Sequence, residues 1–421
     1  MPNLVRPCRL IQPPRHLAHL VASRSYLSYD KSELRDKLSR NPYSYLQVIN
    51  PDAEEEIEAE RGTKEYFREI RTIYDEFLEK GWLEGRDDAC YVIYRQTSPT
   101  NSFTGIVSLL DLPKCEEGGL LTHELTLETR EELFSDYLES VGFHAEPILC
   151  ARPTNHPGED ELNQCIEGIT TAREADCDFS TTDCIRHSVW YVNPELDPEL
   201  TEVLRPLDKL YLADGHHRLA SSIKLKHRHP NEPGVDRILA FILPAKELSI
   251  LGYHRKVVGF TGDLDDLIVK IGAIDSVEKV EKISKQDAKE QKLGCIDILS
   301  AGRSFRVMIK KDESGLRTDA AWLAENVLKG LLGITDPRTD PKLKYIPGNQ
   351  DLNVSEVAKD QITFALHPTP IDQIIAVSDA GLTLPPKSTW VEPKLRSGLF
   401  VYEFGMHPHP TTTPKTTPKI S

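Results

Sequence analysis

The stretch Leu210-Tyr211-Leu212-Ala213-Asp214-Gly215-His216-His217-Arg218 decides how this sequence is interpreted. Its four apolar residues predict a buried strand that ends at Ala213, after which the chain turns at Asp214-Gly215. A helix is expected from His217 to about His227. A strand that turns directly into a helix brings backbone N–H groups and the positive end of the helix dipole to one point. The turn is therefore a candidate anion site.

The side chains of this turn suit phosphate chemistry. Gly215 lets the backbone approach a ligand closely, and Arg218 can donate two hydrogen bonds to a phosphate or carboxylate. His216 and His217 supply hydrogen-bond donors or a general acid, and Asp214 could hold a divalent cation. The alternative is an ordinary tight turn in which Asp214 caps the helix and both histidines are solvated.

His123 and Glu124, followed by Thr126, form a second candidate group. A carboxylate beside an imidazole suits proton abstraction from a hydroxyl group. The alternative is an exposed His-Glu pair on the surface.

A third group of cations and hydroxyls lies near the C-terminus and is flanked by Pro385, Pro386 and Pro393. This pattern resembles a rigid phosphate cradle, and proline stiffening lowers the cost of ordering it. The alternative is a basic surface loop. Its members are Lys387, Ser388, Thr389, Lys394, Arg396, Ser397 and Gly398. Arg338, in the segment 336–340, is similar in character but less specific.

Hydrophobic patterns predict helices and strands in mixed order, which gives the fold class α+β (mixed α/β). The segment 150–178 is rich in Pro, Asn, Gly and acids and is expected to be an exposed loop or mobile helix. Thr369 is expected to cap a helix that starts at Pro370. Expected helices span residues 64–80 and 130–141, and expected strands span 90–95, 103–109, 189–192, 237–243, 305–309 and 362–366.

The predicted organisation has five parts. They are an N-terminal α/β segment (1–110), a catalytic core (111–250), a peripheral α/β subdomain or insertion (251–330), a C-terminal segment with the phosphate-binding loop (331–406) and a disordered tail (407–421).

Composition excludes several classes of protein. The sequence contains 28% charged residues and no run of about 18 uncharged apolar residues, so no membrane span is expected. The net charge of −15 argues against nucleic-acid binding, which requires clustered Lys and Arg. A small, highly charged ligand in a local basic pocket remains compatible with this charge.

The cysteines and the N-terminus bear on localisation. The eight cysteines contain no C-x-x-C pair, so neither a zinc ribbon nor a thioredoxin-type motif is present, and reduced thiols in the cytoplasm are expected. The first 29 residues hold four arginines and no acid. This start is either a mitochondrial transit peptide or an ordinary N-terminal segment.

At these motifs the chain resembles a large family described as a domain of unknown function, marked by A-D-G-H-H-R and P-P-K-S-T-x-F-x-P-K-x-R-S-G-L. Here they read Ala213 to Arg218 and Pro385 to Leu399, with Trp390 after Thr389 and no Phe at the aromatic position. The resemblance runs from Val5 to Phe404, so the arginine-rich start is expected to belong to the domain.

That family is similar to the ParB/sulfiredoxin fold, whose shared phosphate-binding turn is G-x-x-R. Free serine kinases of that fold carry D-G-x-x-R, matched here by Asp214, Gly215 and Arg218. The resemblance implies a ParB/sulfiredoxin-like core with additional N- and C-terminal α/β subdomains. It also matches Glu124, in H-E-x-T, to a glutamate that abstracts a proton.

Two departures from the family concern substrate and donor specificity. In an ungapped alignment, the family's N-terminal P-P-Y-D corresponds to Arg24-Ser25-Tyr26-Leu27. The acidic residue of the motif is therefore absent. The family also has a basic residue after H-E-x-T. This chain lacks it, and Phe134 lies near its place.

The resemblance implies a serine kinase that phosphorylates free L-serine, with pyrophosphate as donor and ATP or ADP as alternatives. The turn residues would hold the transferred phosphoryl group and Asp214 a Mg²⁺ ion, Glu124 would take the hydroxyl proton, and Lys387, Lys394 and Arg396 would hold the rest of the donor. Gly215, Arg338, Ser388, Thr389 and Ser397 would add donor contacts, and His123 and Thr126 substrate contacts. Such transfer needs positioning and charge neutralisation more than covalent chemistry.

Two rival functions use the same turn. A ParB-like nucleotide-binding regulatory protein would bind without transferring, but it should carry a helix-turn-helix and a basic DNA face, and neither is seen. A sulfiredoxin-like reductase would need a cysteine in the turn, where this chain has His216 and His217. The sequence leaves the donor, the acceptor and the oligomeric state open.

Overall fold

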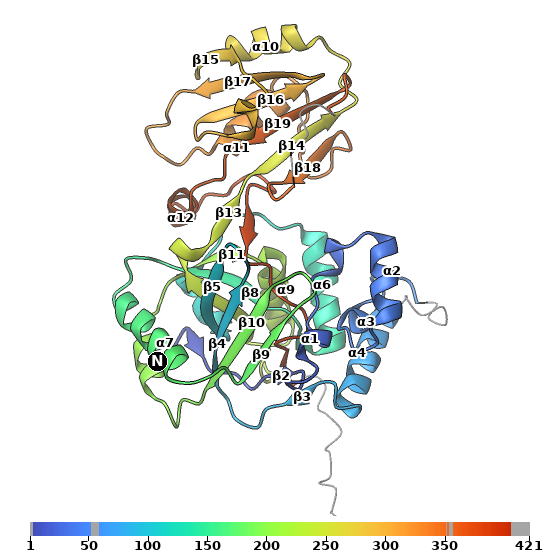
Figure 1. Cartoon of the computed structure of the whole chain (residues 1–421), viewed down its shortest axis with the longest axis vertical. Helices are drawn as coiled ribbons and strands as arrows, with labels where there is room; N and C mark the ends of the chain where they lie inside the picture. The colour runs from blue at the N-terminus through green and yellow to red at the C-terminus, as the bar shows by residue number, and fades with distance from the viewer. Residues whose placement is uncertain (1–2, 52–58, 351, 353–356, 406–421) are drawn as a thin grey trace, which may run out of the picture. The chain divides into compact units, whose positions relative to one another are not determined.

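The computed structural model describes residues 3–51, 59–350, 352 and 357–405 (Figure 1). The fold is mixed α/β, as predicted, and its contacts divide the chain into two compact units. Unit 1 comprises Met1–Leu120, Thr126–Pro244 and Lys394–Ser421, and unit 2 comprises Leu121–Leu125 and Ala245–Pro393. The predicted disordered tail, 407–421, lies outside the described residues.

Unit 1 is built on a mixed nine-stranded sheet with the order β6-β11-β8-β12-β5-β4-β10-β9, and β1 pairs with β5. Strands β8 and β12 are parallel, whereas β11–β8, β12–β5, β5–β4, β4–β10 and β10–β9 are antiparallel pairs. The strands are β1 (Val5–Arg6), β4 (Tyr91–Thr97), β5 (Ser102–Asp111), β6 (Leu120–Leu121), β8 (Ile148–Arg152), β9 (Cys177–Ser180), β10 (Arg186–Val192), β11 (Leu210–Asp214) and β12 (Arg237–Pro244).

Short antiparallel pairs and helices complete unit 1, and Figure 1 shows α2, α3, α4 and α6 gathered beside the large sheet. The short strands are β2 (Ile11–Gln12), β3 (Glu84–Gly85), β7 (Phe143–His144) and β21 (Tyr402–Glu403). The helices are α1 (Ala18–Val21), α2 (Lys31–Arg40), α3 (Leu46–Ile49), α4 (Lys64–Glu79), α5 (Leu112–Lys114), α6 (Glu128–Val141), α7 (Glu159–Ala172), α8 (Glu199–Leu204) and α9 (His216–Arg228), with single turns η1 (Tyr26–Ser28) and η3 (Cys115–Gly119).

The core of unit 1 follows from strand alternation. Ile238, Ala240 and Ile242 of β12 share one face, because successive side chains of a strand point to opposite sides. That face packs against apolar residues of α7, α8 and α9, such as Leu219. Helix α9 is thereby fixed on the sheet directly after β11, and this packing positions the turn between them.

Unit 2 contains a wholly antiparallel six-stranded sheet with the order β15-β17-β16-β19-β14-β18. Its strands are β14 (Tyr253–Val258), β15 (Val277–Lys282), β16 (Cys295–Ser300), β17 (Arg303–Ile309), β18 (Leu343–Pro347) and β19 (Gln361–Leu366). Strand β13 (Ser249–Leu251) pairs with β20 (Trp390–Glu392). The helices are α10 (Leu264–Gly272), α11 (Asp319–Leu323) and α12 (Ile371–Asp379), with turns η4 (Ala245–Glu247), η5 (Asp287–Lys289) and η6 (Ala324–Lys329). Trp322 is fully buried in this core.

Two local predictions need correction, the first only in part, because the segment 150–178 does contain a helix, α7. The segment 150–178 starts in β8, whose residues 148–152 are all buried, and continues into α7 and β9. Its polar composition reflects the connection after Arg152 and the outer face of α7. Thr369 does not cap α12, because Pro370 occupies the N-cap position and the helix begins at Ile371.

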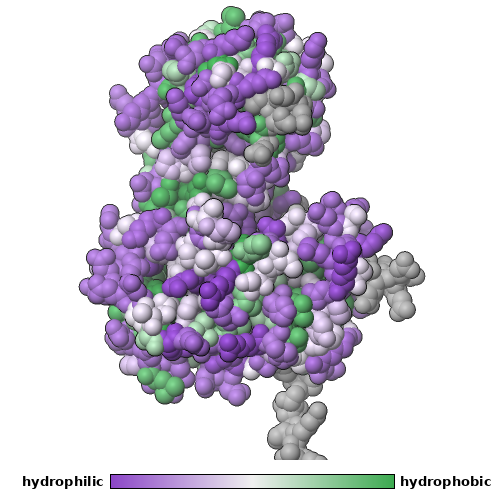
Figure 2. Space-filling view, viewed as in Figure 1, coloured by the Kyte–Doolittle hydropathy of each residue, from purple (hydrophilic) through white to green (hydrophobic). Residues whose placement is uncertain are grey.

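The surface is predominantly polar on the face that Figure 2 shows. Most of the large hydrophobic side chains that are exposed, such as Leu196 and Val269, are separated in the sequence, and Leu133 and Phe134 are adjacent. Within the described residues, no helix is long and apolar enough to cross a bilayer.

Candidate functional site

The turn between β11 and α9 has the backbone geometry that the sequence predicts. Gly215 is the N-cap of α9 with φ 105°, a left-handed conformation that favours glycine. A Cβ at this position would lie 2.8 Å from Ile148 Cγ2, so a side chain would also clash with β8. Helix α9 has no acidic residue in its first turn and no side-chain cap, and its N-terminus keeps its positive potential.

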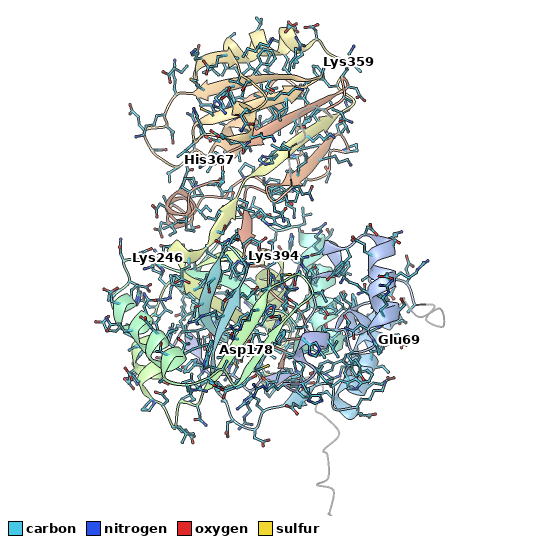
Figure 3. The ribbon with its side chains drawn as sticks, in the orientation of Figure 1. Glu69, Asp178, Lys246, Lys359, His367 and Lys394 are labelled. Carbon is cyan, nitrogen blue, oxygen red and sulfur yellow. The ribbon has the colours of Figure 1, made fainter. Side chains whose placement is uncertain are left out.

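The alternative of an ordinary tight turn with solvated histidines does not agree with the side chains. The N-cap of α9 is Gly215, which has no side chain to cap the helix. The Asp214 carboxylate accepts a hydrogen bond from Lys394 Nζ at 3.0 Å (Lys394 is labelled in Figure 3). His216 is buried rather than solvated, and His217 is half-buried.

The charge of Asp214 is fixed by its neighbours. Burial alone would raise its pKa, but the positive charges of Lys394 and Arg218 outweigh this effect and lower the pKa to about 2. Asp214 is therefore ionised at neutral pH. This state suits a ligand of a cation and does not suit a general base.

Arg218 lies against the chain that leads into β8. Its guanidinium contacts the Glu146 carboxylate at 2.7 Å and donates to the carbonyl oxygens of Glu146 and Pro147 at 3.3 and 2.5 Å. These contacts fix the guanidinium beside the N-terminus of α9, while a quarter of the side chain stays exposed (26%). Arg218 is thus held in place before any ligand binds.

The 394–398 segment brings the C-terminal motif into unit 1. Ser397 exchanges two backbone hydrogen bonds with Ser23, and Gly398 N–H donates to Ala145. The Ser397 hydroxyl also donates to Glu146 Oε2 at 3.0 Å, the carboxylate that holds Arg218. The segment therefore joins Lys394 and Arg218, far apart in sequence, into one cluster around the turn.

Arg396 has a different environment from the one predicted. Its side chain is buried (4% exposed) and its guanidinium bonds Asp183 at 2.7 Å. Burial would raise the pKa of Asp183, but hydrogen bonds from Thr181 and Arg396 lower it. This pair orders the segment, and the predicted donor contact by Arg396 would require it to open.

Six of the predicted site residues lie in unit 2, and they include His123 and Glu124. His123 is buried, so the exposed-pair alternative is wrong for it. Its carbonyl accepts a hydrogen bond from Leu384 N–H at 2.7 Å, and Glu124 forms a parallel bridge with Leu384. The segment that carries Glu124 is thus tied to the start of the Pro385-Pro386-Lys387 loop.

Arg255 links this loop to Glu124. It is 2% exposed, its guanidinium donates to the carbonyl oxygens of Tyr253 and Pro386, and it lies over the Tyr345 ring at 5.5 Å. Burial lowers the pKa of Arg255 to about 10, and Glu124 is among the groups that oppose this shift. Arg255 stays charged at neutral pH, and its charge interacts with that of Glu124.

The loop after Leu384 is ordered by local contacts. Ser388 is buried, and its hydroxyl donates to Pro385 O at 2.6 Å. Lys387 is exposed, has φ 57°, and places its ammonium 5.9 Å from the Tyr253 ring. Thr389 is half-buried. Lys387 is the residue of this loop whose charge reaches solvent.

Two further predicted residues have local partners. Arg338 is exposed in a turn whose Asp336 side chain accepts from Arg338 N–H at 3.0 Å. The Thr126 hydroxyl donates to Glu131 in the first turn of α6. Thr126 belongs to unit 1 and His123 and Glu124 to unit 2. The H-E-x-T motif is therefore divided between the units.

The residues present fit a magnesium ion that is held largely by its substrate. Mg²⁺ usually takes one or two carboxylates, keeps several waters and is completed by substrate phosphates. Asp214 supplies one ionised carboxylate. Within the described part of the chain, no group of three His, Cys, Asp or Glu side chains could hold a metal.

Sequence reasoning missed Asp183, Glu146 and Tyr29. Tyr29 lies close enough to Arg24 and Arg396 for their charges to act on its pKa, which burial raises. Asp30 directly follows Tyr29. Asp30 caps α2 through a capping box. Asp183 and Glu146 carry no local signal, because their cationic partners lie far away in the sequence.

Comparisons with known proteins identify one family. A family model described as "Protein of unknown function (DUF1015)" matches residues 5–331. None of the curated proteins matches the chain.

Several solved structures are similar at low identity. SbnI with a C-terminal truncation, from Staphylococcus aureus, has 13% identity and a TM-score of 0.39, covering 70% of this chain and 85% of that one. A free serine kinase in complex with AMP has 15% identity and a TM-score of 0.37, covering 71% and 92%. A conserved hypothetical protein from Pyrococcus furiosus has 13% identity and a TM-score of 0.36, covering 71% and 95%. Likenesses at TM-scores this low carry no argument about function.

Proposed function

The chain belongs to the DUF1015 family, and for this member we propose a phosphotransferase that transfers a phosphoryl group to free L-serine, with inorganic pyrophosphate as donor. The observation that carries the proposal is the turn at Asp214. An uncapped helix N-terminus, a fixed guanidinium and a lysine converge there around one ionised carboxylate. Such a cluster suits a phosphate group with a bound cation. The ParB/sulfiredoxin-like core and the assignment of serine as acceptor rest on the sequence resemblance.

In the proposed reaction, the serine hydroxyl oxygen attacks the terminal phosphorus of pyrophosphate. The bond from that phosphorus to the bridging oxygen breaks, orthophosphate leaves, and the hydroxyl proton passes to Glu124. The N–H groups at the start of α9 and the side chains of His216, His217 and Arg218 would hold the phosphoryl oxygens. Mg²⁺, held by Asp214 and the donor, would neutralise charge on the phosphates.

Lys394 and Lys387 would hold the remainder of the donor. Lys394 already carries its ammonium to Asp214, and the exposed Lys387 has a charge that no ion pair described for this chain neutralises. Arg396 and Ser397 are proposed to support the donor site by ordering the segment that bears Lys394, since both bond to carboxylates of unit 1.

The direct test is an assay for O-phosphoserine with purified protein, L-serine, Mg²⁺ and, separately, pyrophosphate, ADP or ATP. Phosphoserine should form fastest with pyrophosphate. If phosphoserine forms only with ATP or ADP, the protein is still a phosphotransferase but its donor is a nucleotide. If a nucleotide binds and no donor yields phosphoserine, the regulatory-protein alternative is the correct one.

Arg218→Ala and Arg228→Ala form a matched pair for this assay. Both arginines lie on α9, pair with carboxylates and are partly exposed (26% and 30%). Removing Arg218 should lower kcat by about 10²–10³-fold, because a cationic donor to the transition state is lost. Arg228→Ala, at the other end of the helix, should leave kcat near that of the wild type. Equal activity in the two variants would show that the turn has a structural and not a catalytic role.

Glu124→Gln tests the proton transfer separately. Glutamine keeps the shape of the side chain but accepts no proton, so kcat should fall by about 10²–10⁴-fold while donor Kd hardly changes. Glu128→Gln, an exposed residue in the first turn of α6, is the control. If Glu124→Gln keeps its kcat, the base must be sought among the turn histidines.

A further inference from the structure

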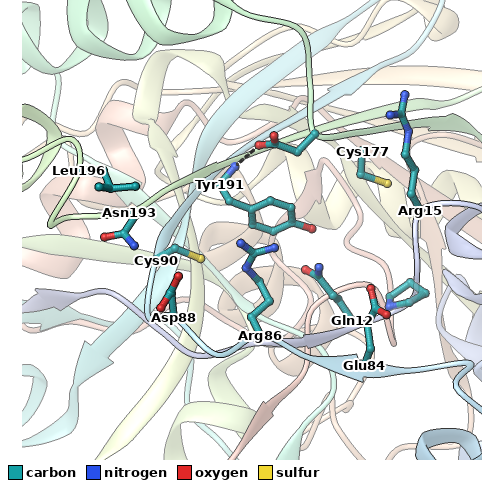
Figure 4. A pocket seen from close by; sticks show the side chains of 12 residues that line it. Gln12, Arg15, Glu84, Arg86, Asp88, Cys90, Cys177, Tyr191, Asn193 and Leu196 are labelled. Carbon is teal, nitrogen blue, oxygen red and sulfur yellow. Dashed lines mark hydrogen bonds between the residues drawn. The ribbon is translucent and has the colours of Figure 1, made fainter. Parts of the chain in front are cut away.

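Unit 1 contains a cavity of about 400 Å³ whose lining includes none of the residues in the proposed reaction (Figure 4). It lies where β4 begins and β10 ends, and strands β2 and β3 form another part of its wall. Cavities of this size accommodate small metabolites. The polar groups of the wall therefore define what chemistry would fit.

Three of these groups share one face of a small antiparallel ladder. Gln12 and Glu84 are directly paired across β2 and β3, and the ladder continues as Arg86 N–H donates to Leu10 O at 2.9 Å. Paired residues of antiparallel strands point to the same side, and so do residues two apart on one strand. Gln12, Glu84 and Arg86 thus present an amide, a carboxylate and a guanidinium together.

Arg86 is held by an aromatic ring. Its guanidinium lies 4.0 Å from the centroid of the Tyr191 ring, and Figure 4 shows both groups beside the Gln12 amide. Tyr191 is itself fixed, because its N–H donates to Asp176 at 2.8 Å and its carbonyl accepts from Arg173 at 2.7 Å. The guanidinium is therefore oriented before a ligand arrives.

Two buried polar atoms of this wall have no partner among the described residues. They are Gln12 Oε1, in a residue that is only 7% exposed, and Arg86 Nε, although the Arg86 side chain also forms a hydrogen bond with Cys90. A buried polar atom without a partner destabilises the fold. The first atom requires a hydrogen-bond donor and the second an acceptor, so a ligand that satisfies both must carry the two functions a few ångströms apart.

The charges of the wall balance. Asp176 is neutralised by Arg173 at 2.7 Å. This leaves two guanidinium groups, of Arg15 and Arg86, and two carboxylates, of Glu84 and Asp88. An anion such as phosphate would meet both carboxylates, and a simple cation would meet both guanidinium groups. A zwitterion matches the wall.

We propose that this cavity binds a free α-amino acid, with its carboxylate on Arg86 and its ammonium group between Gln12 Oε1 and Glu84. The volume leaves space for a side chain larger than that of serine. Leu196, which is 85% exposed, and Cys177 line the same cavity and offer apolar contacts to such a side chain. This site goes beyond the proposed transferase and shares no residue with it.

Calorimetric titration of the full chain with L-leucine tests the proposal. L-Leucine should bind saturably with one site per chain. L-Leucinamide, which lacks the carboxylate, and N-acetyl-L-leucine, which lacks the ammonium group, should each bind about 10- to 100-fold more weakly, because each loses a hydrogen bond to a charged group. Absence of L-leucine binding, or equal binding of the three compounds, would overturn the proposal.

Variants locate the binding. Glu84→Gln should fold normally, since Glu84 is exposed, and should weaken L-leucine about ten-fold or more. Arg205→Gln replaces an exposed arginine at the C-cap of α8; it is the control and should bind as the wild type does. Arg218→Ala should also keep L-leucine binding. If Arg218→Ala loses L-leucine while Glu84→Gln keeps it, the amino acid sits at the β11–α9 turn and the cavity assignment is wrong. Failure of the phosphoserine assay would leave this result unchanged.

Discussion

At the scale of single residues, the ion pair between Asp214 and Lys394 decides the charge of the turn. Asp214 has a pKa of about 2, below the value of about 3.9 expected in the unfolded chain. A carboxylate whose pKa is lower in the folded state stabilises the fold above the unfolded pKa. This contribution disappears as the pH falls through the folded pKa.

Asp214→Asn should therefore lower the free energy of unfolding at neutral pH and hardly change it near pH 2. The pKa difference would correspond to about 2.6 kcal/mol in a shielded site. The Asp214 side chain is 42% exposed, so solvent screening reduces the expected loss to about 1 kcal/mol. Urea unfolding of wild type and variant at several pH values measures the difference. A gap that stays constant down to pH 2 would contradict the assigned ion pair.

Lys387 is a residue at which function and stability oppose each other. Its φ of 57° is costly for a side chain with a Cβ, by about 1 kcal/mol. The same side chain is proposed to hold the donor. Lys387→Gly should accordingly raise the free energy of unfolding by up to about 1 kcal/mol and weaken pyrophosphate binding.

Ala301→Gly is the control for Lys387→Gly. Ala301 also has a positive φ, 50°, in the turn between β16 and β17, and its methyl group carries no charge. This variant should gain stability without a change in donor Kd, measured by urea unfolding and calorimetry. Unchanged donor binding in Lys387→Gly would show that the loop is a basic surface loop.

At the scale of elements, the 394–398 segment carries two cations that differ in burial. Arg396 is buried on Asp183, whereas Lys394 is 37% exposed on Asp214. Arg396→Met leaves a carboxylate without its main partner and should cost about 3 kcal/mol of stability. Adding Asp183→Asn should recover part of this loss. Lys394→Met should cost about 1 kcal/mol or less and lower activity with the fold intact.

Measuring kcat and the denaturation midpoint of these variants tests whether Arg396 is structural and Lys394 belongs to the donor site. Lys394→Met with a normal kcat would remove Lys394 from the donor site. Arg396→Met with unchanged stability would contradict the structural function of the buried pair.

The elements themselves were largely predictable, because their patterns are local. Apolar residues on one face predicted α4, and apolar runs predicted β11 and β12 to within a few residues. The exceptions include β8, a buried strand without alternation that leads into a polar segment, and elements for which the pattern gave no expectation, such as α2, α10 and β16. The turn at Asp214 was predictable for the same local reason. Its partners were not, since Glu146 and Asp183 reach their cations only after β8, β9 and the C-terminal segment have packed.

At the scale of the whole molecule, net charge distinguishes the two functions considered for the turn, a phosphotransferase and a DNA-binding regulator. The chain has 51 Lys and Arg against 66 Asp and Glu, a net charge of −15. Duplex DNA carries about one negative charge per 1.7 Å, so a protein must neutralise several phosphates to bind it. The cations proposed to hold phosphate near Asp214, Arg218 and Lys394, would be enough for a small ligand but not for a duplex.

The protein should therefore leave the fluorescence anisotropy of a labelled DNA duplex unchanged at low salt, where electrostatic binding is strongest. Pyrophosphate should still bind under the same conditions, because Lys394 and the start of α9 act over a distance shorter than the Debye length, about 10 Å at 0.1 M salt. Arg218→Ala should weaken pyrophosphate and have no effect on DNA. Duplex binding that decreases steeply with salt would favour the DNA-binding regulator, because such a slope counts the phosphates that the protein neutralises.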